Sequence, residues 1–195
     1  MTQQEKFIEA AKKERFCLKY LLPLIKSDKY EWLQIVTPID GKDYYDALLM
    51  AMDKETKSIV KRFIVEVKVR QKIYEDYIME VKKIKDIKSI MVDPDATILY
   101  ISVTPEGTFL YNVNELESKN LLEVGTLHCN KSTMKSTYDK VDKDVYNLKK
   151  EWAVKKFDFT FNNIDYLNDI KDIEKLDKIE KNKIDLYNIL GFKKR

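Results

Sequence analysis

The 195-residue sequence is poor in glycine, and this shortage excludes several common kinds of nucleotide site. Its 4 glycines are Gly41, Gly107, Gly125 and Gly191, and no two of them lie close enough to form a loop that cradles phosphate. The fingerprints of dinucleotide-binding and P-loop proteins are therefore absent. This removes most nucleotide-dependent enzymes from consideration.

Cysteine and histidine are equally scarce. The 2 cysteines, Cys17 and Cys129, are too few and too isolated for a disulfide framework or a zinc site. The single histidine, His128, precedes Cys129 directly. Adjacent residues on a strand point to opposite faces, which disfavours a Cys–His nucleophile pair. We expect both cysteines to be reduced and buried.

The sequence contains no secretory signal and no apolar run long enough to span a membrane. We therefore expect a cytoplasmic, intracellular protein without a membrane partner. Charged residues make up 35% of the chain, but 36 basic against 33 acidic residues leave a net charge of only +3. A strongly polycationic binder is excluded, whereas a local basic patch is not. The bias toward Lys, Ile, Asn, Asp and Tyr is typical of an AT-rich bacterial or phage genome.

Hydrophobic periodicity predicts strands and helices that alternate along one main domain, residues 1–160. A charged helical extension is expected to follow, residues 161–195. The predicted elements of the main domain are, in chain order, a helix over 3–22, strands over 44–52 and 58–70, a helix over 73–91, strands over 97–103 and 108–113, and short strands near 121–128 and 153–161.

Residues 63–70 place a carboxylate and an ammonium inside an otherwise apolar run. The alternation predicts a strand with valines on one face and with Glu66 and Lys68 on the other. The side chains of Glu66 and Lys68 must then lie beside each other. Because Lys and Glu are rarely buried unless paired, we interpret this pair as part of a chemical site.

Two further carboxylates are expected near this pair. Asp46 lies on the preceding predicted strand, which should form a hairpin with the strand of Glu66. Glu14 falls in the middle of the apolar stripe of the first helix, at 100° per residue. Three carboxylates around one lysine would repel one another, so the cluster predicts a cation. Mg²⁺ is usually held by one or two carboxylates together with waters and substrate phosphate.

The order of these features resembles the restriction-endonuclease-like PD-(D/E)xK nuclease superfamily. A helix with an inward Glu14 is followed by a strand with Asp46, a strand with Glu66-Val67-Lys68, a helix and a strand. The resemblance covers residues 7–113. It implies an α/β (α+β) fold with a central mixed β-sheet flanked by helices, on an α-β-β-β-α-β core. Tyr45 stands where the family motif has proline.

The resemblance also implies roles for individual residues. In that family the motif aspartate and glutamate bind a divalent metal, together with the backbone carbonyl between Glu and Lys. Carried over, Asp46, Glu66 and the carbonyl of Val67 become ligands of Mg²⁺ or Mn²⁺. Lys68 becomes the catalytic cation that orients the attacking water, and Glu14 the acidic residue of the first helix.

The activity that follows from the resemblance is metal-dependent hydrolysis of DNA phosphodiester bonds, with DNA as the partner. Arg70, Lys72 and Tyr74 are expected to contact the nucleic acid, through charge or by stacking. The sequence does not separate an endonuclease from an exonuclease or a junction resolvase, nor DNA from RNA. It also leaves open whether the protein is a homo-oligomer.

Other interpretations stay open. Glu-x-Lys also occurs at residues 55–57, 80–82 and 117–119, in predicted loops or on a predicted helix, where positions i and i+2 do not share a face. The site could be an ion-paired patch on the solvent side of a sheet. The protein could instead be a non-catalytic module that binds nucleic acid or protein on the same fold. A third alternative is an assembly protein whose charged tail is the interaction element.

Overall fold

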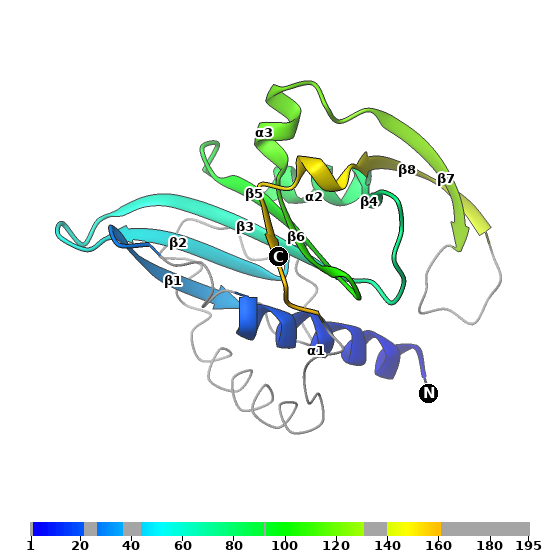
Figure 1. Ribbon diagram of the computed structural model, residues 1–195, viewed down its shortest axis with the longest axis horizontal. Helices are drawn as coiled ribbons and strands as arrows, with labels where there is room; N and C mark the ends of the chain where they lie inside the picture. The colour runs from blue at the N-terminus through cyan, green and yellow to red at the C-terminus, as the bar shows by residue number, and fades with distance from the viewer. Residues whose placement is uncertain (1, 22–26, 37–43, 92, 131–139, 161–195) are drawn as a thin grey trace.

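The computed structural model describes residues 2–21, 27–36, 44–91, 93–130 and 140–160. These residues form a mixed α/β protein with a curled, mixed sheet and few helices (Figure 1). The predicted extension, residues 161–195, lies outside the described residues. No helix among the described residues is both long enough and apolar enough to cross a membrane.

The large sheet has the strand order β1-β2-β3-β5-β6-β9. Its first three strands form an antiparallel meander, and β5 then pairs with β3 in the parallel direction. Strands β6 and β9 close the other edge in the antiparallel direction. The bounds are β1 Tyr30–Val36, β2 Ala47–Asp53, β3 Ile59–Val69, β5 Thr97–Thr104, β6 Gly107–Asn112 and β9 Lys155–Phe157.

Each face of the large sheet is covered by different elements (Figure 1). Helix α1, Gln3–Leu21, packs on one face with Cys17, Leu18 and Leu21 against the buried valines of β3. Helix α2, Val81–Ile90, covers the other face with Ile84 and Ile87. Burying an aliphatic side chain of this size stabilises the fold by about 1.5–3 kcal/mol. These contacts therefore fix which face of each helix is turned toward the sheet.

A second, three-stranded antiparallel sheet lies on the α2 side, with the order β4-β8-β7. Its strands are β4 Tyr77–Glu80, β7 Val124–Asn130 and β8 Lys140–Leu148. Tyr77 and Met79 of β4 and Leu148 of β8 enter the same core as α2. The remaining short elements are α3 Val113–Ser118 and the 3-10 turn η2 Lys150–Trp152.

Several expectations from the sequence are confirmed. The strands predicted over 44–52 and 58–70 form the antiparallel pair β2–β3, and β5 and β6 form the predicted hairpin. Strand β2 begins only at Ala47, however, so Asp46 lies just before it and not on it as predicted. The two faces of β3 separate as expected, with Ile64 in the core under α2 and with Val65 and Val67 in the core under α1. Both cysteines are free, but Cys129 is only partly buried.

Several elements differ from the expectations. Strands β1 and β8 were not predicted, because both carry polar residues that blur the alternation. The short helix α3 was not predicted either. The helix predicted over 73–91 begins only at Val81, after strand β4. In β4, buried Tyr77 and Met79 alternate with less buried neighbours. Tyr77 and Val81 are both buried and lie four residues apart, which also fits a helix. Periodicity alone therefore did not distinguish a strand from a helix in this segment.

Candidate active site

The predicted site lies where β2 begins and β3 continues. The last pair of the β2–β3 ladder joins Ala47 to Val65. Strand β3 runs on to Val69, and there its partner in the described part of the chain is β5. In the described part of the chain, no strand pairs with this side of β3 beyond Val65. Polar groups at such an edge need other partners.

Asp46 supplies these partners on both sides of Glu66. Its backbone N–H donates to the carbonyl of Val65 at 2.9 Å. Its carboxylate Oδ2 accepts a hydrogen bond from the N–H of Val67 at 2.7 Å. Asp46 thus continues the ladder with a side chain and fixes its own carboxylate next to the peptide between Glu66 and Lys68.

The carbonyl of Val67 points to the same side of β3 as this N–H, since both groups of one strand residue face the same neighbour. It therefore points toward the edge at which Asp46 lies. This carbonyl is the one predicted from the sequence to be a metal ligand. The structure thus brings a carboxylate and a backbone oxygen to one edge of β3.

Glu66 is the most deeply buried charge of the site, with a fully buried side chain. Oε1 lies 2.8 Å from Nζ of Lys68, and Oε2 lies 2.9 Å from Nζ of Lys83. A buried carboxylate requires such compensation, because an unpaired one is costly to remove from water. Each oxygen of Glu66 therefore lies close to one ammonium group, but neither contact has hydrogen-bond geometry among the described residues.

Glu14 reaches the same cluster from helix α1. Its Oε1 lies 3.2 Å from Nζ of Lys68, which is thereby shared between two carboxylates. The Glu14 side chain is 18% exposed and that of Lys68 is 41% exposed. The prediction that Glu14 lies on the inward face of its helix is confirmed. The site is buried at Glu66 and open to solvent at Lys68.

The electrostatics of the cluster are unbalanced. Burial raises the pKa of Asp46 well above its usual range, and the negative charges of Glu66 and Glu14 raise it further. Burial also raises the pKa of Glu14, against the attraction of Lys68. Burial acts to lower the pKa of Lys68, but the carboxylates, Glu66 foremost, raise it well above its usual range. The cluster thus favours additional positive charge, as a proton or as a cation.

Lys83 is the member of the cluster that sequence reasoning missed. It lies in the first turn of α2, beside the buried residues Ile84 and Ile87. Several lysines crowd this helix, and helical spacing alone gives no reason to choose Lys83 among them. The packing of α2 on the sheet decides which lysine meets Glu66.

The three residues expected to contact nucleic acid do not join the cluster. Nη2 of Arg70 donates to the carbonyl of Ile78 in β4 and, at 3.0 Å, to the hydroxyl of Tyr100 in β5. Its side chain is thus engaged inside the fold. Lys72 and Tyr74 are exposed on the segment that joins β3 to β4. Their contact with nucleic acid stays a prediction.

The oxygen donors of the site suit a hard divalent cation. Among the described residues, no three His, Cys, Asp or Glu side chains are grouped so as to hold a metal ion by themselves. Mg²⁺ does not need such a cage, since it commonly keeps several waters and uses one or two carboxylates. Asp46, Glu66 and the carbonyl of Val67 are donors of this kind. The donor chemistry therefore fits Mg²⁺ or Mn²⁺.

The Cys–His alternative finds no support in the geometry. His128 pairs through Nδ1 with Asp142 at 2.8 Å on the exposed β7–β8 ribbon. Burial of Cys17 in helix α1, together with the negative charge of Glu14, raises the pKa of its thiol to about 12. A thiol with this pKa is protonated and is a poor nucleophile at neutral pH.

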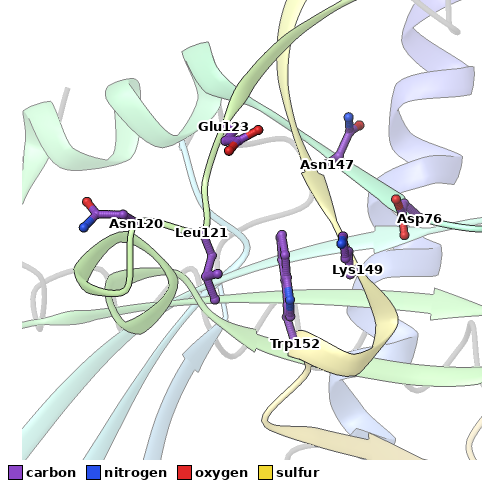
Figure 2. Close-up of a pocket in the computed structure, with 7 residues that line it drawn as sticks. All are labelled: Asp76, Asn120, Leu121, Glu123, Asn147, Lys149 and Trp152. Carbon is purple, nitrogen blue, oxygen red and sulfur yellow. The ribbon is translucent and has the colours of Figure 1, made fainter.

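A separate pocket of about 280 Å³ lies between β8, η2 and the segment after α3 (Figure 2). Nζ of Lys149 lies 5.4 Å from the centre of the Trp152 ring. None of the predicted site residues lines this pocket. Its lining residues are Asp76, Asn120, Leu121, Glu123, Asn147, Lys149 and Trp152.

Comparison of the chain with models of known protein families and with curated proteins gives no match.

Proposed function

We propose that the protein is a metal-dependent nuclease of the PD-(D/E)xK type that hydrolyses DNA phosphodiester bonds, with Mg²⁺ or Mn²⁺ as its cofactor. One observation carries the proposal: Asp46 accepts a hydrogen bond from the N–H of Val67, which holds its carboxylate beside the strand segment that contains Glu66 and Lys68. Asp46, Glu66 and the carbonyl of Val67 would hold the ion.

The arrangement of the elements supports the same proposal. The described part of the chain has a helix, three antiparallel strands, a helix and a strand parallel to the third, in that order. Apart from β4, which lies between β3 and α2, this order agrees with the α-β-β-β-α-β core that the resemblance implies. In that core, β4, β6–β9 and the small sheet would be additions.

The residues of the site can be given distinct tasks. A bound divalent cation would stabilise negative charge that develops on the phosphate oxygens and acidify a bound water. Lys68 keeps its positive charge and reaches solvent, so it can hold the attacking water or a phosphate oxygen. Glu14 positions Lys68 through the 3.2 Å contact. Asp46 and Glu66 would supply carboxylate oxygens as ligands of the ion.

Cleavage assays test the proposal directly. Plasmid, linear and branched DNA are incubated with Mg²⁺ or Mn²⁺ and the wild-type protein, Lys68→Met or Asp46→Asn. We expect each substitution to reduce cleavage about 10²–10³-fold, the size of effect seen when one charge-stabilising group is removed. The matched control is Lys119→Met, at another Glu-x-Lys, whose exposed lysine pairs with Glu115. Undiminished cleavage by Lys68→Met and Asp46→Asn would reject the assignment.

A non-catalytic binding module on the same fold is the second candidate. It is favoured by the ion pairs of Glu66, both of whose oxygens already face ammonium groups. A protein that has lost its metal would retain such a closed network. A binder of this kind should show no rise in Tm with Mg²⁺ or Mn²⁺, whereas a ligand of the folded state raises it.

A further inference from the structure

We propose that Lys83 is an internal counter-ion of Glu66 that competes with the divalent metal and is displaced when the metal binds. The inference deepens the proposed function and rests on it. It assigns to one helix residue the control of how tightly the site holds its metal.

The contacts of Glu66 require such a competition. Both carboxylate oxygens lie within 2.9 Å of an ammonium group, and the side chain is fully buried. A Mg²⁺ ion about 2.1 Å from the same oxygen as an ammonium would lie at most about 5 Å from it. At that distance in a poorly solvated site, the two positive charges repel strongly. The withdrawal of one ammonium would therefore strengthen the binding of the metal to Glu66.

Lys83 is the ammonium that can withdraw. Lys68 is held by Glu66 and also by Glu14, and it lies on the same strand as Glu66. Within the described residues, the only carboxylate within ion-pair distance of Lys83 is Glu66. The side chain of Lys83 is 28% exposed, so its flexible stem can turn into solvent without unfolding α2.

The position of Lys83 on its helix also favours its withdrawal. The first turn of α2 contains no acidic residue, and Lys83 lies in that turn. A cation near a helix N-terminus is unfavourable, because the helix dipole places partial positive charge there. Glu66 compensates for this position in the metal-free protein. Once the metal neutralises Glu66, the dipole favours the departure of Lys83.

The test is metal affinity, measured without substrate. Mn²⁺ is titrated into chelator-treated protein, and binding is followed by calorimetry and by the rise in Tm. We expect Lys83→Met to bind Mn²⁺ at least about tenfold more tightly than the wild type, while its metal-free form melts at a lower temperature. Lys83→Arg keeps the charge and should restore the wild-type affinity. The matched control is Lys85→Met, an exposed lysine of the same helix, whose affinity should equal that of the wild type.

Two results would overturn the inference. If the wild type binds Mn²⁺ and Lys83→Met binds it equally or more weakly, Lys83 does not compete, while the proposed function stands. If neither the wild type nor any variant binds Mn²⁺, the proposed function fails together with the inference. Should Lys83→Met not fold, Lys83→Gln removes the charge but retains a hydrogen-bond donor for Glu66, and the same affinities decide.

Discussion

Two polar clusters lie near the end of β3, and they differ in how well their charges are matched. The acidic site consists of Glu14, Asp46, Glu66, Lys68 and Lys83. The arginine–tyrosine network consists of Arg70, Tyr77, Tyr100, Glu106 and Lys150. Arg70 follows Lys68 by two residues, so the two clusters are neighbours along the chain at the end of β3.

The network is balanced by its own hydrogen bonds. Glu106 accepts from the hydroxyl of Tyr77 and lies 2.6 Å from Nζ of Lys150. Burial acts to raise the pKa of Glu106, but the hydrogen bonds from Lys150 and Tyr77 lower it below its usual value. A carboxylate with such partners stays ionised and needs no further ligand.

The acidic site has three carboxyl groups and two ammonium groups, and its carboxyl groups Asp46 and Glu14 have raised pKa values. One cluster near the end of β3 thus has its carboxylate fully compensated, and the other still favours additional positive charge. Strongly perturbed ionisable groups of the second kind are typical of functional sites. This difference agrees with the proposed ligand-binding role of the acidic site, whereas the network is satisfied by its own contacts.

The largest expected effect separates the two clusters by activity. Glu66→Gln removes a proposed metal ligand, and we expect cleavage of DNA in Mg²⁺ to fall at least about 10²–10³-fold, the loss typical for one charge-stabilising group. Glu106→Gln is the matched control, because it neutralises a carboxylate of the network. It should leave the cleavage rate unchanged. Equal losses in both variants would erase the functional distinction.

An intermediate effect concerns stability. Arg70→Met removes hydrogen bonds to the carbonyl of Ile78 and to the hydroxyl of Tyr100. The Tyr100 hydroxyl still donates to the carbonyl of Ile78 at 2.9 Å, so the expected loss is that of hydrogen bonds to a charged group, about 1.5–3 kcal/mol. About 2–4 °C of Tm accompanies each kcal/mol in a chain of this size. Thermal melts should show this loss.

The same variant also tests the predicted contact of Arg70 with nucleic acid. DNA affinity is measured at several salt concentrations. If Arg70→Met weakens binding and flattens its salt dependence while Tm is unchanged, Arg70 contacts phosphate and the network is not structural. Lys72→Met, at an exposed position, provides the comparison for a lysine that the fold does not engage.

The smallest expected effect concerns pH. The pKa of Asp46 is raised in the folded protein, so the folded state binds a proton more readily than the unfolded chain. This contribution to stability is present at acidic pH and is lost as the pH rises through the raised pKa. Asp46→Asn keeps an oxygen for the N–H of Val67 and removes the charge. We expect its metal-free form to melt a few degrees above the wild type at neutral pH, from about 1 kcal/mol of relieved repulsion.

Melts of the two proteins from pH 4 to 8, in chelator, measure this difference. The gap in Tm should widen toward neutral pH and close at acidic pH. A variant that melts below the wild type at neutral pH would mean that the Asp46 carboxylate stabilises the metal-free site. The acidic site would then be as balanced as the network, and the comparison would fail.

Much of the core was predictable because strand and helix periodicities are local. The alternation of β3 predicted that Glu66 and Lys68 share a face, and the helical stripe predicted that Glu14 points inward. Segments with mixed patterns were not predictable in this way. Strand β4 was mistaken for the start of α2, since Tyr77 and Val81 also fit a helical spacing.

The sequence by itself determined which charges lie beside one another along a single strand or helix, because backbone geometry sets side-chain direction. Only the tertiary structure decided which elements bring further groups to them. It turned Arg70 into the interior and brought Lys83 of α2 to Glu66 of β3. Such contacts depend on how the helices pack on the sheet, and this packing involves many apolar residues that are distant in the sequence. The periodicity of a single segment therefore does not predict them.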